Sequence, residues 1–381
     1  MPPARLSPVR RILFTSILAA LVVIYLEIFL QIFYFASVGD FLFRRALPPI
    51  YAADPVRCYR VASDLDYVHR TNEFEIQIYT NSLGLRTDAS HREYAKPKPD
   101  DVYRILVTGP SFAFGWGANY EEIFPTLIER GLSVPGKRVE VMNLGTPSQG
   151  SAHQLCWMKE VGYAYQPDMV LHVSYGNEVN PVAMDCPTRA ELECPTIEDG
   201  QLVPAGVDSV ARAKAFVKRF ALVFYGYYAW NAVAKPEPVP DATRSLYAKG
   251  ETASGSETSF EALADTYAGH VDFLKHLLGE RTQVAFIYLP YSFAVHPDDI
   301  VRFPGLTPED VPITRERIAA GVEAVTARGL PILDTLPPLM KAASDHRLYY
   351  WLDIHFTPYG NRVVAEVATP FVQELIDRSQ P

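Results

Sequence analysis

The sequence predicts an α/β protein in which helices cover both faces of a parallel sheet, preceded by one N-terminal transmembrane helix. The first observation is a set of short, nearly continuous apolar runs that alternate with amphipathic stretches, as buried parallel strands and their helices do. The second is an apolar N-terminal run, Ile12 to Gly39, with a single formal charge at Glu27. About 20 apolar residues suffice to cross a bilayer, so this run is long enough.

The N-terminal run is predicted to be a retained anchor. A cleaved signal peptide has an apolar core of about 7–15 residues and a small-x-small cleavage site, whereas this run is longer. We therefore expect a cytoplasmic tail at 1–11, a single-pass anchor in the lipid bilayer at 12–37 and an extracytoplasmic body, periplasmic or on the cell surface. The arginines on the two sides of the run favour this orientation, three before it and two after it: Arg5, Arg10, Arg11, Arg44 and Arg45.

Glu27 and Gln31 are four residues apart and share one face of the expected anchor helix. Polar side chains are costly in lipid unless they snorkel, become protonated or meet a partner. Two interpretations stay open: the pair is tolerated within the helix, or it contacts a partner helix, such as one from a membrane protein partner.

Residues 38–99 are predicted to be a juxtamembrane, β-containing lead-in. Residues 73–80 alternate polar and apolar side chains, which indicates a half-buried strand. Asn81 to Gly84 indicates a turn. Lys96 to Asp100 is rich in proline and is interpreted as a linker before the main domain at 100–380.

Apolar runs within 100–380 predict five strands: 103–108, 139–144, 169–175, 284–289 and 331–333. The stretches between and after them predict helices: 121–132, 151–164, 258–279, 313–328 and 358–377. Parallel sheets of this kind bind ligands beyond the carboxyl ends of their strands. The residues that follow each strand are therefore the place to look for chemistry.

Residues 180–257 depart from the alternation and are interpreted as an insertion over the active face. Cys186 and Cys194 bracket a seven-residue loop in it, which predicts a short disulfide if the body lies in an oxidising compartment; two free cysteines are the alternative. A stripe of aromatic side chains is interpreted as core packing or as a lid or membrane-contacting cap: Phe216, Phe220, Phe224, Tyr225, Tyr228 and Trp230.

The composition excludes several functions. The chain has 35 basic and 44 acidic side chains, a net charge of −9, whereas nucleic-acid binders usually carry the opposite sign. The four cysteines form no C-x-x-C pair, and H-E-x-x-H is absent from the sequence. No nucleic-acid partner, no metal site and no cofactor are therefore expected.

The predicted strand ends carry reactive groups. Ser111 follows the first strand among small residues, where its hydroxyl and N–H would both be accessible. The loop 143–150 after the second strand could present another N–H, and the side chain of Asn177 after the third could donate a hydrogen bond. Near the C-terminus, His355 could act as a general base, with Asp353 fixing its tautomer.

Together these loops resemble the four sequence blocks of the SGNH (GDSL-like) hydrolase family, in the same order and at the same strand ends. The stretches that carry the resemblance are RILVTGPSFAFGWG, VMNLGTPSQGS, YQPDMVLHVSYGNE and DIHFTPYGN. The upstream NSLGLR is similar to the lead-in of membrane-anchored bacterial members. The resemblance covers roughly residues 100–380.

The resemblance implies a flavodoxin-like, three-layer α/β/α hydrolase. Ser111 would be its nucleophile, His355 its base and Asp353 the acid that orients the base. The residue types fit this chemistry, because acyl transfer needs a nucleophile, a proton acceptor and preorganised donors that converge on one point.

The resemblance also implies an oxyanion hole, formed by the Ser111 N–H, the second loop at Gly145 and Ser148, and the Asn177 side chain. Three positions near this hole depart from the family pattern. Pro110 stands where the family usually has aspartate, Ser148 where it has glycine and Glu178 where it has aspartate.

Two hypotheses of different classes follow. The first is a membrane-anchored SGNH-type esterase or O-acyltransferase that acts on an acylated extracytoplasmic glycan or lipid through Ser111. The alternative is a catalytically degenerate SGNH-like domain that serves as a binding or structural subunit of a membrane complex. Pro110, Ser148 and the polar pair in the anchor motivate the alternative.

Overall fold

The structure, a computed structural model, describes residues 7–38, 41–44, 48–71, 73–175, 186–187, 194–198, 200–203, 213, 216–217, 219–226, 260–303, 306–351 and 353–379. The chain divides into two compact units. The helical unit comprises Met1–Leu47 and Gly206–Glu237, and the sheet unit comprises Pro48–Ala205 and Pro238–Pro381.

The sheet unit is built on a five-stranded sheet in the order β7-β6-β8-β11-β12, with every neighbouring pair parallel. Numbered along the chain, this order is 2-1-3-4-5, the flavodoxin-like arrangement that the resemblance implies. The order reverses between β6 and β8, and sheets of this type bind ligands beyond the carboxyl ends of the strands at such a reversal. The five strands agree with the predicted ones: β6 (Val102–Thr108), β7 (Arg138–Asn143), β8 (Met169–Tyr175), β11 (Gln283–Leu289) and β12 (Ile332–Asp334).

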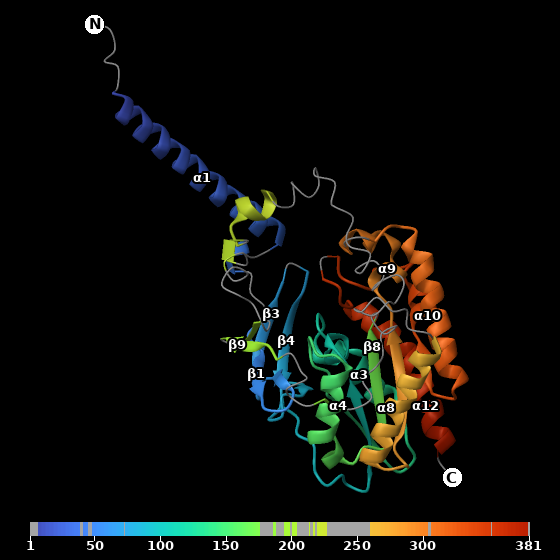
Figure 1. Cartoon of the computed structure of the whole chain (residues 1–381). Helices are drawn as coiled ribbons and strands as arrows, with labels where there is room; N and C mark the ends of the chain where they lie inside the picture. The colour runs from blue at the N-terminus through green and yellow to red at the C-terminus, as the bar shows by residue number, and fades with distance from the viewer. Residues whose placement is uncertain are drawn as a thin grey trace. The chain divides into compact units, whose positions relative to one another are not determined.

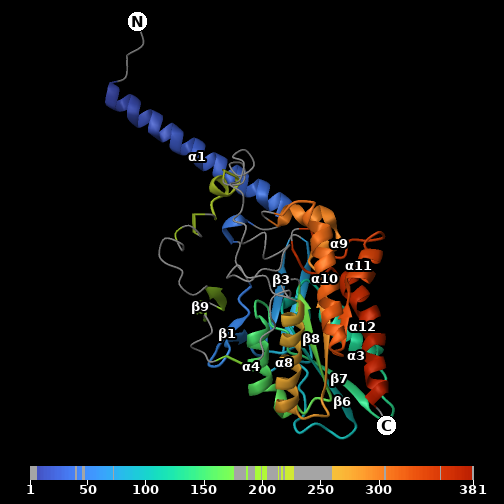
Figure 2. The ribbon, with the colours of Figure 1, turned by 45° about the vertical axis from the view of Figure 1, so that its right-hand side comes forward.

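Helices cover both faces of this sheet, because its strands are apolar on both sides (Figures 1 and 2). Ile105 and Val107 of β6 pack with α3 and α12, whereas Leu106 packs with α4 and α8 on the opposite face. The α/β/α prediction is confirmed. The helices are η2 (Tyr120–Glu122), α3 (Phe124–Gly131), α4 (Ser151–Glu160), η3 (Gly162–Tyr165), α8 (Phe260–Leu278), α9 (Ser292–Val295), η5 (Pro297–Arg302), α10 (Asp310–Ala327), α11 (Leu336–Ala342) and α12 (Pro358–Ser379).

The lead-in contains two small antiparallel sheets. One pairs β1 (Tyr51–Asp54) with β2 (Cys58–Val61), and the other orders β3 (Asp66–Arg70), β4 (Glu75–Thr80) and β5 (Arg86–Thr87). Along β4, the side chains of Ile76, Ile78 and Thr80 are buried and alternate with more exposed ones, as the sequence alternation predicts.

Both disulfides join the insertion to other parts of the sheet unit. Cys194 pairs with Cys58 of β2, and Cys186 pairs with Cys156 of α4. The predicted Cys186–Cys194 disulfide is therefore wrong: the fold brings each cysteine closer to a partner distant in sequence. A short hairpin of β9 (Thr196–Glu198) and β10 (Gln201–Val203) follows Cys194. Most of 180–257, including Tyr228 and Trp230, lies outside the described residues.

The helical unit contains α1 (Pro8–Val38) and η1 (Leu42–Arg44). Among the described residues, α1 is the one helix long and apolar enough to cross a membrane, as a signal anchor or a signal sequence would be. Glu27 and Gln31 contact residues 219–222 of the same chain. The partner of the polar pair is thus an internal one.

Candidate active site

Ser111 lies at the carboxyl end of β6, as the first residue of the short helix α2 (Ser111–Phe114). Pro110 occupies the N-cap position with φ −75°, which suits the proline ring. The carbonyl of Pro110 accepts a hydrogen bond from the N–H of Phe114 at 3.1 Å. Gly115 then ends the helix with φ 85°, a left-handed conformation that favours glycine. Pro110 is therefore compatible with the turn that presents Ser111.

The loop before α12 brings His355 and Asp353 to Ser111. The Nε2 atom of His355 lies 2.6 Å from Ser111 Oγ, and its Nδ1 atom is hydrogen-bonded to Asp353 Oδ1. The same Asp353 oxygen accepts the backbone N–H of His355 at 2.9 Å. The structure thus places the three residues singled out in the sequence in one continuous hydrogen-bonded chain.

Aromatic rings enclose the imidazole. The ring centroids of Phe112 and Trp116 lie 4.8 and 5.8 Å from that of His355, and the His355 side chain is 12% exposed. Burial tends to raise the pKa of Asp353, but hydrogen bonds and charge interaction with His355, together with a hydrogen bond from Trp116, hold it below its ordinary value. Asp353 is therefore a carboxylate at neutral pH, and this charge stabilises a protonated imidazole beside it.

The structure differs among the residues of the expected oxyanion hole. The Gly145 N–H donates to Asn143 Oδ1 at 2.9 Å, so its hydrogen bond is already made. Gly145 instead allows the loop to approach α2, since a Cβ there would lie 2.3 Å from the Phe114 nitrogen. Ser148 adopts φ 64°, a left-handed conformation that is uncommon for residues other than glycine. Asn177 lies outside the described residues.

Among the described residues, the backbone N–H groups of Ser111 and Ser148 have no backbone acceptor. The first begins α2, where helix geometry leaves an N–H without an intrahelical partner. Backbone N–H groups of this kind are the donors that an oxyanion needs.

Glu73 and Arg302 hold the loop that carries Asp353 and His355. The two carboxylate oxygens of Glu73 accept the backbone N–H groups of Trp351 and Asp353 at 2.6 and 2.8 Å. The Nη1 atom of Arg302 donates to the carbonyls of Tyr350, Trp351 and Asp353 at 2.9–3.0 Å. The loop backbone is therefore fixed on both its donor and its acceptor sides.

The lead-in also holds the second loop. The side-chain amide of Gln149 donates to the Tyr59 carbonyl at 2.6 Å, and the Tyr59 hydroxyl donates to the Ser148 carbonyl. The lead-in thus positions both the loop at Ser148 and, through Glu73, the loop at Asp353.

His69 of β3 lies close to the site. Its ring contacts Trp116 and Phe74, with centroids 4.9 and 5.3 Å apart. Burial lowers the pKa of His69 to about 4, against the opposing charge of Asp353 and with smaller contributions from Arg86 and His355. Its Nε2 atom is buried and has no hydrogen-bond partner within the part of the chain that the structure describes. His69 is therefore neutral at physiological pH.

Sequence reasoning missed Glu73, Arg302, Tyr59 and His69 as parts of the site. Glu73 and Arg302 bind backbone groups of the loop, and backbone groups leave no signature in the sequence. Only the alternating strand pattern at 73–80 drew attention to that segment, and it did so for packing.

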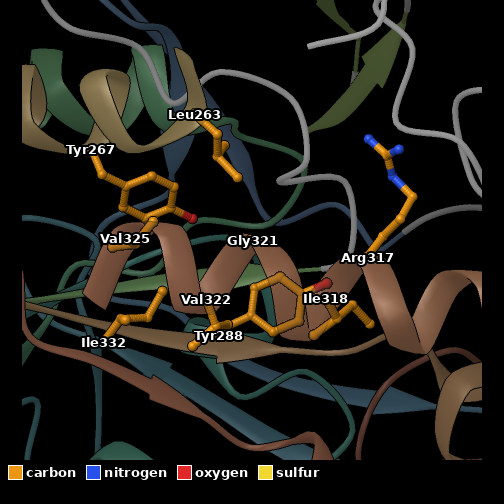
Figure 3. A pocket seen from close by; sticks show the side chains of 9 residues that line it. All are labelled: Leu263, Tyr267, Tyr288, Arg317, Ile318, Gly321, Val322, Val325 and Ile332. Carbon is orange, nitrogen blue, oxygen red and sulfur yellow. The ribbon is translucent and has the colours of Figure 1, made fainter. Parts of the chain in front are cut away.

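A small cavity lies elsewhere in the sheet unit, between α8, α10 and the strands β11 and β12 (Figure 3). It measures about 20 Å³, which is room for about one water molecule. Its lining is mainly apolar and includes Leu263, Val325 and Ile332. None of the site residues lines it. Among the described residues, no group of three His, Cys, Asp or Glu side chains could hold a metal ion.

Serine hydrolases use a hydroxyl, an imidazole and a carboxylate in this arrangement for acyl transfer. No protein-family model matches the sequence, and no curated protein matches it. The solved structures that it resembles are SGNH/GDSL-type esterases and lipolytic proteins, over about 71% of the chain.

One of these is a catalytic mutant of an acetylxylan esterase from Geobacillus stearothermophilus: 11% identity, TM-score 0.38, 71% of this chain and 94% of that one. A member of the lipolytic protein G-D-S-L family from Veillonella parvula has 9% identity and a TM-score of 0.36, over 70% and 96%. The aryl esterase of M. smegmatis has 13% identity and a TM-score of 0.36, over 71% and 99%.

Proposed function

We propose that this chain is a membrane-anchored serine esterase or O-acyltransferase that acts on an acylated extracytoplasmic glycan or lipid. The observation that carries the proposal is the hydrogen-bonded chain from Ser111 through His355 to Asp353. A carboxylate on Nδ1 fixes the tautomer in which Nε2 accepts the serine proton.

The reaction has two halves. Ser111 Oγ attacks the ester carbonyl while His355 Nε2 takes the hydroxyl proton, and the resulting oxyanion is stabilised by the N–H groups of Ser111 and Ser148. The intermediate collapses to an acyl-serine as His355 returns the proton to the leaving alkoxide. Water or a sugar hydroxyl then attacks the acyl-serine by the reverse sequence of proton transfers, which gives hydrolysis or acyl transfer respectively.

Contacts of α1 support a retained anchor. Glu27 and Gln31 hydrogen-bond to residues 219–222, and cleavage of α1 would remove these partners. The two disulfides support an extracytoplasmic location, because disulfides persist mainly in oxidising compartments.

Hydrolysis of p-nitrophenyl acetate by the full-length protein in mild detergent tests the proposal, beside Ser111→Ala. Labelling by a fluorophosphonate, followed by peptide mass spectrometry, should place the adduct on Ser111. We expect the wild type to hydrolyse the ester and the variant to lose at least about 10³-fold in kcat. Equal rates for the two proteins would contradict the proposal and favour the non-catalytic binding subunit. Adding an acceptor oligosaccharide then separates transfer from hydrolysis.

A further inference from the structure

Glu27 of α1 is the attachment point for residues 219–226. Its carboxylate oxygens accept the backbone N–H groups of Ala221 and Leu222 at 2.8 and 2.9 Å. Gln31, one turn further along α1, donates to Glu27 at 2.8 Å and to the Arg219 carbonyl at 3.0 Å. The polar groups of α1 are thereby matched by backbone groups at the start of the helical residues 221–226.

Ring contacts extend this interface along α1. Tyr34 packs edge-on against Phe224 with centroids 5.7 Å apart, and Phe33 does the same against Tyr225 at 5.9 Å. Ala221 is fully buried in the same cluster. One face of residues 221–226 therefore packs against α1.

Outside this contact, the segment exposes four apolar side chains, each 39–59% exposed: Phe216, Val217, Phe220 and Val223. Arg219, which lies between them in the sequence, is exposed as well. The exposed apolar side chains of α1 include Ile28, Phe29 and Ile32, which lie at the same level of the helix as Glu27 and Gln31. Exposed apolar patches of this kind mark a contact with protein or with a membrane.

We propose that residues 216–217 and 219–226 form a second membrane-embedded segment, held in the outer leaflet by docking on α1. The acyl chains of the bilayer contact the exposed face of this segment, which is made by Phe216, Val217, Phe220 and Val223. This inference rests on the proposed function only in taking α1 as a retained anchor with the body outside.

The depth of Glu27 fits this location. About 20 residues of the anchor 12–37 fill the hydrocarbon core, so a core that starts at Ile12, after the basic tail, ends near Gln31 and leaves residues 32–37 for the outer headgroup region. At about 1.5 Å per residue, Glu27 lies about 6 Å inside the outer boundary. Interfacial segments bury their apolar faces about 5–10 Å into this region, so a segment docked at Glu27 is at the right level.

Spin labelling of single introduced cysteines tests where the face lies. All four native cysteines are in disulfides, so an introduced cysteine is the single free thiol. Phe220→Cys is compared with Ile17→Cys in α1 and with Glu374→Cys on the exposed surface of α12. The full-length protein is reconstituted in vesicles of phosphatidylcholine and phosphatidylglycerol. Collision rates are measured with oxygen, which enriches in lipid, and with a nickel chelate, which stays in water.

We expect oxygen collisions to dominate at Phe220→Cys and Ile17→Cys, and nickel-chelate collisions to dominate at Glu374→Cys. A water-like profile at Phe220→Cys overturns the inference. Protection from both reagents overturns it too, because protein, either a second copy or a partner, would then cover the face.

Two further measurements on the same samples, intact mass and ester hydrolysis, distinguish failure of the membrane segment from failure of the proposed function. An intact mass that lacks the N-terminal residues would contradict the retained anchor. If Phe220→Cys gives a lipid-like profile but the wild type does not hydrolyse p-nitrophenyl acetate, the membrane segment is supported and the esterase proposal is contradicted.

Disulfide cross-linking tests the docking itself. We expect Tyr34→Cys with Phe224→Cys to cross-link on oxidation, and Tyr34→Cys with Phe216→Cys to cross-link several-fold less, since Phe216 belongs to the exposed face. Adding Glu27→Leu to the first pair should lower its yield several-fold. Equal yields for the two pairs, or an unchanged yield with Glu27→Leu, would overturn the docking.

Discussion

The carboxylate of Glu73 accepts the backbone N–H of Asp353 at 2.8 Å, although the two residues are 280 positions apart. Its other oxygen accepts the N–H of Trp351. Glu73 lies in the turn between β3 and β4. A small sheet outside the α/β/α core therefore positions the backbone of the loop that carries Asp353 and His355. The lead-in is therefore part of the candidate active site.

Glu73→Gln should lower kcat with little change in KM, because Glu73 orients the Asp353 loop and does not contact the ester. The amide keeps one acceptor oxygen and loses the charge, and a hydrogen bond to a charged group contributes about 1.5–3 kcal/mol. We expect a loss of about 10–100-fold in kcat. Glu75→Gln is the matched control, since Glu75 pairs with Arg70 on the surface. Equal effects of the two variants would exclude a positioning role for Glu73.

His355→Ala should abolish acylation while leaving the fold nearly intact, because Glu73 and Arg302 hold the loop through its backbone and not through the imidazole. Asp353→Asn should cost less, since Ser111 and His355 remain and the orienting group is partly replaceable. Fluorophosphonate labelling rates and thermal unfolding of each variant check both effects. Wild-type acylation by His355→Ala would end the triad assignment. Full activity of Asp353→Asn would mean that another acid holds the imidazole.

The sequence predicted the sheet and the proposed triad because both depend on local patterns. Apolar runs define the strands, parallel pairing brings their carboxyl ends to one edge, and Ser111 follows one of these strands directly. Sequence could not predict the roles of Glu73 and Arg302. Their partners are backbone groups of a distant loop, and only the tertiary structure decides which backbone a side chain reaches.

The wrong disulfide prediction has the same origin. Cys186 and Cys194 are close in sequence, yet each is bonded to a more distant cysteine. The resemblance also implies an oxyanion donor at Gly145. Its N–H is instead bonded to Asn143, a contact that depends on a side-chain rotamer rather than on spacing.

Gly145→Ala should impair activity through α2. A Cβ at this position would lie 2.3 Å from the Phe114 nitrogen and 2.6 Å from the Ala113 carbonyl carbon, so the backbone of α2 must shift, and α2 begins with Ser111. Overpacking of this kind costs about 1–3 kcal/mol of stability. Gly150→Ala is the control, because its Cβ would meet nothing within 4 Å and its φ is −86°. If Gly145→Ala matched Gly150→Ala in kcat and in melting temperature, the close approach to α2 would not matter.

Non-reducing peptide mapping of protein from native membranes should recover Cys58 joined to Cys194 and Cys156 joined to Cys186. The two disulfides span 136 and 30 residues. On the chain-entropy model, they stabilise by about 5 and about 4 kcal/mol respectively. Cys58→Ser should therefore lower the denaturation midpoint at least as much as Cys186→Ser. Recovery of a Cys186–Cys194 peptide, or of four free thiols, would contradict the two disulfides.

His69 should make the protein sensitive to acid. Its folded-state pKa of about 4 lies below the value of about 6.5 for an unfolded chain. Between these values the unfolded state binds a proton that the folded state does not, so stability falls as the pH drops from about 6.5 toward 4. At pH 5 this lowers the free energy of unfolding by about 2 kcal/mol.

His69→Asn should reduce the difference in unfolding free energy between pH 7 and pH 5 by about 2 kcal/mol. Urea denaturation of the full-length protein in mild detergent measures this difference. His276→Asn, at an exposed position of α8, removes a histidine away from the site and is the matched control. The same difference in wild type and His69→Asn would show that His69 is not the group that titrates.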